Sequence, residues 1–181
     1  MSLVRALIPL SPFPVPAVAE APSGSVAHVG TVERILLRPE AAGVSYEVPR
    51  AQALEGLGLQ GDRYFNGEGT FYEDGKSGQD LTLIEAEALE ALRAEHGIAL
   101  RAEEAGRNLL TRGVDLNALV GRRFRIGAVE CFGDRPCDPC ATLARRTDPG
   151  VLRGLAGRGG LRADIVRGGE IATGAEVVVL D

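Results

Sequence analysis

Short apolar runs of strand length, separated by glycine-containing turns, make up most of this chain, which holds 24 glycines. Polar and apolar residues alternate over Val26 to Leu37, and the turn Arg38-Pro39 leads to a second run, Val44 to Val48. These two runs are expected to pair as a hairpin. Only one long helix is predicted, from Glu85 to His96, with Gly97 ending it. The pattern predicts a mainly β fold: a closed or partly closed antiparallel β-barrel with a few helices.

The remaining predicted elements are short. Strands are expected at Leu81–Ile84, Asn108–Thr111, Arg123–Phe132, Leu161–Val166 and Glu176–Leu180, the last two being joined by a turn at Gly168-Gly169. Helical turns are expected at Glu103–Ala105 and from Asp148-Pro149 to Leu155, with Asp148 as the N-cap. The regular strand–helix alternation of a doubly wound fold and a phosphate loop of the GxxxxGK type are both missing.

A chain of 181 residues is long enough for one domain with a substantial core. We expect an extended Pro-rich arm over residues 1–24 and a single domain over residues 25–181. Four prolines interrupt the apolar stretch of the arm, which is unlike a secretory signal, and no run of about 20 apolar residues exists. We therefore expect a cytoplasmic protein that does not span a membrane.

The charge balance limits the ligands. The net charge of −5 argues against general binding to nucleic acid, because affinity for a phosphate backbone requires an excess of Lys and Arg. Nearly all basic residues are arginines, Lys76 being the only lysine. Guanidinium groups bind oxyanions in a bidentate manner, so a small anionic ligand remains compatible with the acidic total.

The segment Asp134–Arg146 carries two of the three cysteines, Cys137 and Cys140, among arginines and prolines. Neighbouring cations favour a thiolate, which is the nucleophilic and metal-binding form of cysteine. Four interpretations follow: a redox dithiol, half of a zinc site, one reactive cysteine, or two incidental thiols. A zinc site would need further ligands from Cys131, His28 and His96. The reactive-cysteine interpretation favours Cys140, which follows Pro139 and is expected at the start of a helix.

Other polar groups have an ordinary interpretation beside a functional one. The Gly61-Asp62-Arg63 turn is typical of a surface ion pair, and it also suits a ligand contact. The same applies to Asn108 and Arg112, which flank a predicted strand, because Arg112 can bind an anion or pair with Asp115. The remaining arginines are expected to form a solvated face; they are Arg145, Arg146, Arg158, Arg162 and Arg167. Cys131, in an apolar run, is expected to be buried.

Taken together, these motifs resemble the MOSC domain, the module at the C-terminus of molybdenum cofactor sulfurases. The resemblance covers Val26 to Leu180 and depends on the order and spacing of several pieces. They are Gly61-Asp62-Arg63, Leu81-Thr82-Leu83-Ile84, Asn108-Leu109, Arg112–Gly121, Arg123–Gly127, Arg135-Pro136, Pro139-Cys140-x-x-Leu143 and Gly169-x-Ile171. The family also occurs as stand-alone bacterial proteins and in amidoxime-reducing molybdoenzymes.

The resemblance implies a barrel of the MOSC type, similar to the pyruvate kinase barrel, and a functional Cys140. In the molybdoenzymes the equivalent cysteine ligates molybdenum, and arginines hold the phosphate of the pterin cofactor. Here the residues implied for cofactor binding are Arg63, Asp62, Asn108, Arg112, Arg135 and Arg145. The implied chemistry is reduction of small N-hydroxylated substrates with electrons from a separate reductase. Pyridoxal phosphate, also mentioned for the family, belongs to an aminotransferase-like domain that is absent here.

In sulfurase-related members, the cysteine is proposed to carry sulfur. Here Cys140 would accept persulfide sulfur from a cysteine desulfurase and deliver it to a metal centre, and Cys137 would act as a resolving thiol or form a disulfide with it. A third alternative is an anion-binding module without catalysis. The chain departs from the family pattern at Tyr64, where many members have histidine, at the additional Cys137, and at Gly174-Ala175. The substrate, the electron donor and the oligomeric state do not follow from the sequence.

Overall fold

The computed structural model describes residues 28–41 and 43–180, so the predicted arm over residues 1–24 lies outside the described part of the chain. Its elements in chain order are β1 (His28–Leu37), β2 (Tyr46–Val48), β3 (Arg50–Leu54), β4 (Gly58–Leu59), β5 (Leu81–Glu85), α1 (Ala86–His96), α2 (Ala102–Ala105), β6 (Leu109–Arg112), the 3-10 turn η1 (Asn117–Leu119), β7 (Arg123–Ile126), β8 (Val129–Pro136), α3 (Ala141–Arg146), α4 (Val151–Gly154), β9 (Leu161–Arg167), β10 (Gly169–Ala172) and β11 (Glu176–Leu180).

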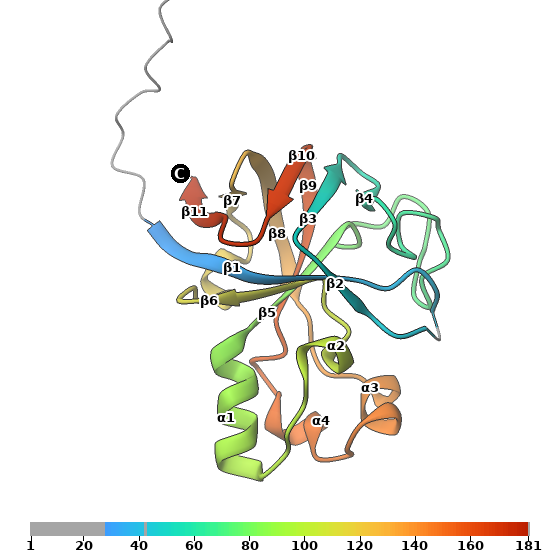
Figure 1. The fold of residues 1–181 in the computed structure, drawn as a ribbon, viewed down its shortest axis with the longest axis vertical. Helices are drawn as coiled ribbons and strands as arrows, with labels where there is room; N and C mark the ends of the chain where they lie inside the picture. The colour runs from blue at the N-terminus through green and yellow to red at the C-terminus, as the bar shows by residue number, and fades with distance from the viewer. Residues whose placement is uncertain (1–27, 42, 181) are drawn as a thin grey trace, which may run out of the picture.

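A closed barrel forms the body of the described chain. The main sheet has the order β11-β7-β8-β9-β5-β6-β1-β2, and β1 also pairs with β11. This pairing closes seven of the described strands into a ring, with β2 attached to β1 outside it (Figure 1). Within the ring only β5 and β6 run parallel, because α1 and α2 form the crossover between them. The predicted mainly β barrel is therefore confirmed.

Alternating residues of the strands fill the barrel. On β9, Leu161, Ala163 and Ile165 are buried while the residues between them are half-buried. They pack in one cluster with Phe124 of β7 and Leu81 of β5. Full burial of a large aliphatic or aromatic side chain contributes about 1.5–3 kcal/mol, so this interior is the main source of stability.

The helices gather at one end of the barrel, below the strands in Figure 1. The predicted long helix is confirmed as α1, which Gly97 ends in a left-handed conformation (φ 69°) while donating its N–H to the Arg93 carbonyl. Leu92 of α1 packs with Val151 and Leu155 in a second apolar cluster between the helices and the barrel. Cys140 is partly buried against the same cluster.

One predicted strand is wrong in its extent. Arg123–Phe132 was expected to be continuous, but it folds back as the antiparallel strands β7 and β8. Gly127 makes the turn with φ 58°, a left-handed conformation that is accessible to glycine at little cost. The apolar residues on both sides of Gly127 gave the run the appearance of a single strand.

The expected direct turn at Gly168-Gly169 between the last two strands is also wrong. The chain instead forms β10, which pairs with β3 in a separate sheet of order β10-β3-β4. Ile171 of β10 and Ala51 and Ala53 of β3 are buried, so this small sheet packs its apolar face against the barrel core. Neither β3 nor β4 was predicted, because both are short and because the other partner of β3, β10, is distant in sequence.

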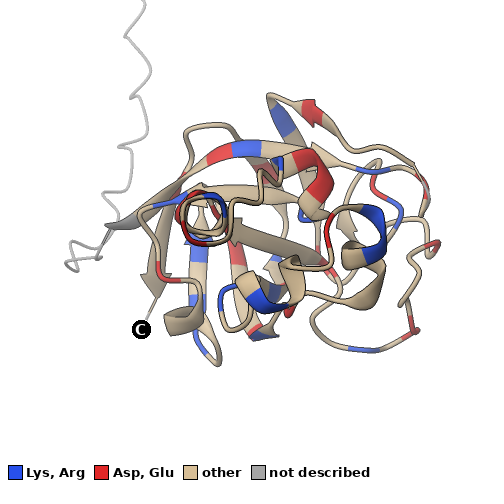
Figure 2. Cartoon of the chain, turned by 90° about the horizontal axis from the view of Figure 1, so that it is seen from below, with Lys and Arg blue, Asp and Glu red and all other residues tan. Residues whose placement is uncertain are grey.

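Basic and acidic residues are mixed over the elements when the molecule is viewed from the helical end (Figure 2). No helix in the described residues is both long and apolar enough to cross a lipid bilayer.

Candidate functional site

The two cysteines lie between the end of β8 and the start of α3. The Cys137 N–H donates to the Gly160 carbonyl at 2.7 Å, which fixes the segment against the residue preceding β9. Cys140 is the N-cap of α3 with extended backbone angles (φ −121°, ψ 162°), as predicted for a cysteine at the start of a helix. Its carbonyl accepts the N–H of Ala144 at 3.1 Å. The strand end and the helix start therefore hold both cysteines in place.

The three thiols have different environments. Cys137 is 3% exposed, Cys140 is half-buried, and both line one cavity of about 110 Å³. Cys131 lies inside the barrel, as expected for a buried cysteine, and burial raises the pKa of its thiol. Because Cys131 does not line the cavity, it is not placed to complete a zinc site there. In the described ranges, no three His, Cys, Asp or Glu side chains group to hold a metal ion.

Arginines from separate parts of the chain surround the same cavity: Arg38, Arg63, Arg107, Arg146 and Arg162. Arg38 follows β1, Arg107 precedes β6, Arg146 ends α3 and Arg162 lies on β9. Arg63 lies in the turn after β4. The order of neighbouring strands, β9-β5-β6-β1, therefore brings Arg38, Arg107 and Arg162 together. Helix α3 and the turn after β4 add Arg146 and Arg63.

Arg107 is buried and fixed by main-chain oxygens alone. Its Nη1, Nε and Nη2 donate to the carbonyls of Ala105 (3.0 Å), Gly159 (3.1 Å) and Cys137 (2.9 Å). In the described part of the chain it forms no ion pair with a carboxylate. Arg107 thus connects the cysteine segment to the end of α2 and to the residues before β9, and it leaves a positive charge in the cavity wall.

Burial and the neighbouring arginines destabilise the charged form of Arg38. Burial, the largest cause, and the nearby charges of Arg63, Arg146 and Arg107 together lower the pKa of its guanidinium to about 10, against the opposing effect of Asp62. A charged group that is destabilised in this way gains from a bound anion. The cavity is therefore suited electrostatically to an anionic ligand.

Asp62 and Asn108 support this arrangement from outside the cavity. Asp62 is buried; its Oδ2 accepts the Arg38 N–H (3.0 Å) and Asn108 Nδ2 (3.2 Å), and its Oδ1 accepts the Tyr64 N–H (3.1 Å). Asn108 Oδ1 also accepts the Thr82 hydroxyl at 2.8 Å. Neither residue lines the cavity. Both fix the backbone that carries Arg38 and Arg63.

The other three predicted cofactor arginines do not line the cavity. Arg112 pairs with Glu33 of β1 and with Glu90 of α1. Arg135 pairs with Asp134 and donates to the Ser77 carbonyl, and exposed Arg145 donates to the Thr142 hydroxyl. Of the predicted site residues, the cavity therefore combines Cys137, Cys140 and Arg63.

Four cavity arginines were not among the predicted cofactor contacts: Arg38, Arg107, Arg146 and Arg162. Arg146 and Arg162 were assigned to a solvated face, and Arg38 to a turn. Alternation on β9 places Arg162 opposite the buried Leu161 and Ala163, on the face where a solvated arginine also lies, so it did not distinguish a cavity residue. No sequence pattern distinguishes Arg107 from a surface arginine.

The residue types that line the cavity suit the implied molybdenum cofactor, whereas the volume of the cavity is small for it. A soft thiolate beside several guanidinium groups suits a metal ligand next to an anionic group. The volume, about 110 Å³, is well below the roughly 300–1,000 Å³ of typical ligand pockets. The cavity therefore accommodates the part of the cofactor next to Cys140, and the rest of a pterin cofactor would extend past the exposed lining residues Phe71 and Arg146.

Comparison with known proteins identifies the family of the chain and structures with a similar fold. The model of the MOSC domain family matches residues 72–178. The structure is similar to YuaD from Bacillus subtilis, with a TM-score of 0.70 at 19% identity over 83% of this chain and 94% of that chain. It is also similar to YiiM from Escherichia coli, with a TM-score of 0.61 at 19% identity over 83% and 70% of the two chains. For YiiM from Geobacillus stearothermophilus the TM-score is 0.59, at 16% identity over 86% and 75%. Curated protein sequences give no significant match.

Proposed function

The chain belongs to the MOSC domain family, and from this premise we propose that it binds the molybdenum cofactor through the Cys140 thiolate. One observation carries the proposal: a half-buried thiol shares its cavity with five guanidinium groups. The thiolate is the soft donor for the metal. The arginines supply the positive charge for the phosphate of the cofactor.

The cavity residues have different proposed roles in binding. Cys140 is the metal ligand, and Arg38, Arg63, Arg146 and Arg162 are the candidates for the anion. Arg107 is already bound to three carbonyls, so it contributes charge and holds the Cys137 backbone rather than donating to a ligand. We do not assign cofactor binding to Arg112, Arg135 or Arg145, because they lie outside the cavity.

When bound, the cofactor supplies a two-electron redox centre. The proposed reaction is the reductive removal of oxygen from a small N-hydroxylated compound: the N–O bond breaks, and two electrons and two protons yield an N–H group and water. The electrons come from a separate reductase, which is the proposed partner. The role of the chain is to hold the centre and to keep the cations close to the anionic group.

Elemental analysis of protein purified from a host that makes the cofactor tests the proposal. We expect molybdenum in the wild-type protein, and at least about a tenfold loss in Cys140→Ser, which removes the soft donor. Arg146→Gln is expected to lower the molybdenum content, whereas Arg145→Gln, one residue earlier and outside the cavity, retains it. The absence of molybdenum above background, with loading also failing in vitro, would exclude this function.

The second thiol favours an alternative, a sulfur carrier. Cys137 lines the same cavity only three residues before Cys140. The Cys140 thiolate would attack the outer sulfur of a desulfurase persulfide, forming a new S–S bond and releasing the desulfurase thiolate. Attack of Cys137 on the Cys140 persulfide would then form a disulfide and release hydrogen sulfide.

Mass spectrometry after incubation with a cysteine desulfurase separates the alternatives. A carrier shows one added sulfur atom on Cys140, which a reductant removes, and Cys137→Ser prolongs the lifetime of this adduct. No adduct on Cys140 counts against the carrier. If Cys140→Ala leaves every measured activity unchanged, the third alternative, an anion-binding module without catalysis, holds.

A further inference from the structure

A second cavity, of about 470 Å³, adjoins the cavity that Cys137 and Cys140 line, here called the cysteine cavity. The long loop between β4 and β5 forms much of the wall of the second cavity. Of the described residues, Tyr64 alone lines both cavities. No role assigned above uses its side chain.

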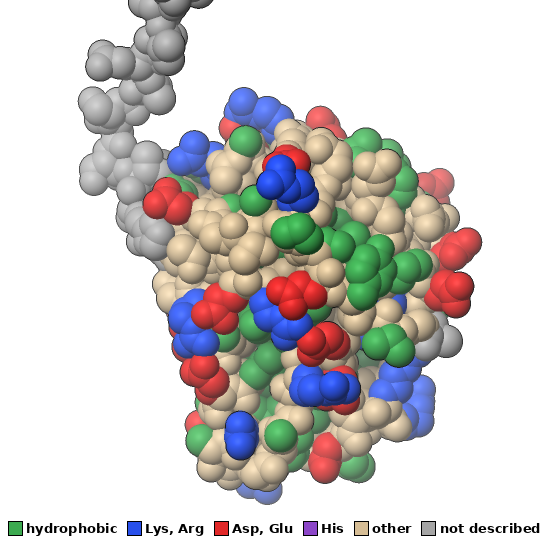
Figure 3. Space-filling model, in the orientation of Figure 1, with side chains coloured by type: hydrophobic (Ala, Val, Ile, Leu, Met, Phe, Trp, Pro, Cys, Tyr) green, Lys and Arg blue, Asp and Glu red, His purple; other side chains and the backbone are tan. Residues whose placement is uncertain are grey.

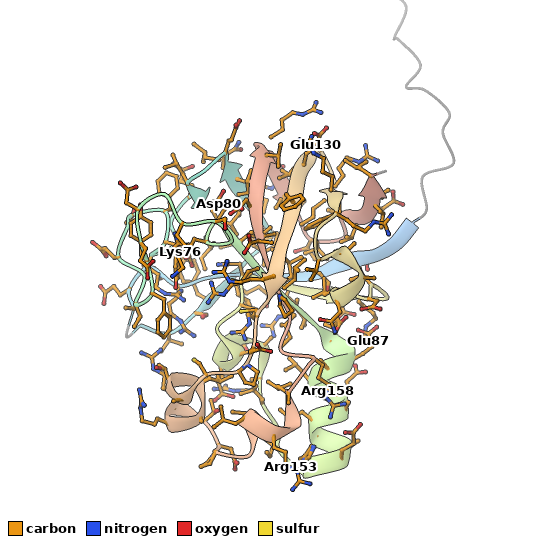
Figure 4. All side chains as sticks on the ribbon, turned by 180° about the vertical axis from the view of Figure 1, so that it is seen from behind. Lys76, Asp80, Glu87, Glu130, Arg153 and Arg158 are labelled. Carbon is orange, nitrogen blue, oxygen red and sulfur yellow. The ribbon has the colours of Figure 1, made fainter. Side chains whose placement is uncertain are left out.

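The two cavities lie end to end on one face of the β5–β9 strand pair. Thr82 of β5 is directly opposite Arg162 of β9, and both line the cysteine cavity. Asp80, which immediately precedes β5 (Figure 4), and Asp164 of β9 line the second cavity. Each lies two residues along the chain from a member of the first pair, so alternation places all four on the same face. Tyr64, which belongs to both walls, therefore lies where the two cavities meet.

Contacts on several sides fix the Tyr64 side chain. The guanidinium carbon of Arg63 lies 5.0 Å from the centroid of its ring, within the range of a cation–π interaction. The Tyr72 ring meets it edge to face, with 6.5 Å between the centroids. A Cβ added to Gly69 would lie 2.6 Å from its Cζ, so the Gly69 backbone packs against the ring. The Tyr64 N–H donates to the buried Asp62 carboxylate at 3.1 Å. The ring is thus a fixed wall rather than a side chain that swings aside.

The loop beside Tyr64 opens both cavities to solvent. Phe71, which lines the cysteine cavity, and Tyr72, which lines the second cavity, are exposed. Figure 3 shows a group of hydrophobic side chains over this part of the surface. A molecule can therefore enter the second cavity from solvent, and its passage from there to Cys140 depends on the Tyr64 ring.

We propose that Tyr64 is a specificity-determining residue, whose ring separates the two cavities and prevents bulky molecules in the second cavity from reaching the Cys140 thiol. With the ring in place, the cysteine cavity has a volume of about 110 Å³; without it, this space would join the second cavity. The proposal rests on the function proposed above only in taking Cys140 as the reacting group. The separation of the cavities does not depend on molybdenum.

Alkylation of Cys140 by two neutral maleimides of different size tests the separation. The full chain without cofactor is treated with N-ethylmaleimide or with N-(1-pyrenyl)maleimide, and mass spectrometry of its peptides gives the rate at each cysteine. We expect the ratio of the rate with the bulky reagent to the rate with the small one to rise at least about tenfold in Tyr64→Ala. Tyr64→Phe, the matched control, keeps the ring and is expected to change this ratio by less than about twofold.

Gly69→Ala provides a second variant, which leaves Tyr64 in the chain. Its methyl group is expected to displace the ring, because three ring atoms lie within 2.7 Å of the Cβ position. We expect the ratio to rise at least about threefold. Cys131, inside the barrel, is the internal control, because a variant that only loosens the fold also exposes this thiol to both reagents.

The proposal is overturned if the ratio in Tyr64→Ala stays at the wild-type value, if Tyr64→Phe raises it as much, or if the bulky reagent does not modify Cys140 in Tyr64→Ala. Labelling of Cys131 as fast as Cys140 in Tyr64→Ala would also overturn it, since unfolding would then explain the result. An unchanged ratio in Gly69→Ala would contradict a fixed wall. A failure here leaves molybdenum binding at Cys140 intact, and failed molybdenum loading leaves the separation by Tyr64 intact.

Discussion

At the scale of single residues, Arg107 is the side chain on which the cysteine segment most depends. Arg107→Gln leaves carbonyls of Ala105, Gly159 or Cys137 without a partner in a buried place. We expect a loss of about 2–4 kcal/mol in the free energy of unfolding, measured with urea. Arg153→Gln, an exposed change on α4, is expected to alter stability by less than about 0.5 kcal/mol. Similar losses in the two variants would contradict the structural role of Arg107.

The half-buried Glu85 gives a prediction with a defined pH dependence. Burial raises the pKa of its carboxyl, and the charge of Asp115 adds to the effect, although the Leu116 N–H donates to Oε1 at 2.8 Å. The folded state then holds the proton more tightly than the unfolded state does. Stability is therefore lost as the pH rises from the ordinary pKa of glutamate through the folded value.

Glu85→Gln keeps the acceptor and removes the charge. We expect it to unfold at a higher temperature than the wild type at neutral pH, with a gain of no more than about 1 kcal/mol because solvent screens the site. The gain should disappear near pH 4, at about the ordinary pKa of glutamate, where both proteins are largely uncharged at this position. Calorimetry at the two pH values measures it, with the exposed Glu170→Gln as control. A gain that persists at the acidic pH would show that charge is not its cause.

At the scale of elements, the approach of β5 to the start of β9 depends on Gly160. This residue has φ 107°, and a Cβ would lie 1.9 Å from the Leu83 carbonyl oxygen. Its own carbonyl accepts the Cys137 N–H. Gly160→Ala is expected to cost more than about 3 kcal/mol, because backbone atoms must separate.

Gly157→Ala is the matched control for this prediction. Gly157 also has positive φ, 73°, but no atom lies within 4 Å of its Cβ position. We expect a cost of about 1 kcal/mol from the backbone conformation alone. Chemical denaturation of both variants measures the difference. If the two costs were equal, the close packing at Gly160 would not be a determinant of stability.

At the scale of the whole molecule, the pairing of β1 with β11 closes the barrel. Deletion of residues 176–181 removes β11, including the buried Val177 and Val178, and exposes the edges of β1 and β7. We expect loss of the cooperative thermal transition and aggregation, because free strand edges pair between molecules.

Deletion of residues 1–24 provides the contrast and tests the predicted domain boundary. It is expected to leave the melting temperature unchanged, as followed by circular dichroism, if the domain indeed begins near residue 25. A lower melting temperature would place part of that segment within the domain.

The parts of the candidate site that depend on residues close together in sequence could be predicted. Cys140 at the start of a helix, Cys137 beside it and the turn that carries Arg63 follow from residue types close together in sequence. Arg112 and Arg145 were natural candidates by the same criterion, yet they lie outside the cavity. Whether an arginine meets a carboxylate, a carbonyl or a ligand depends on what the other strands bring next to it, and this is not encoded locally.

The sequence by itself determined the β class of the fold, the helix α1 with its Gly97 end, and the place of the cysteines before α3. These features depend on periodicity, capping and turn residues within a few positions of one another. The tertiary structure decided the hairpin at Gly127, the pairing of β10 with β3, and the meeting of Arg38, Arg107 and Arg162 around Cys140. The pairing of β10 with β3 and the strand order β9-β5-β6-β1 join residues that are distant along the chain, so local patterns do not reveal them. The hairpin at Gly127 is local, but the apolar residues on both sides of the turn conceal it.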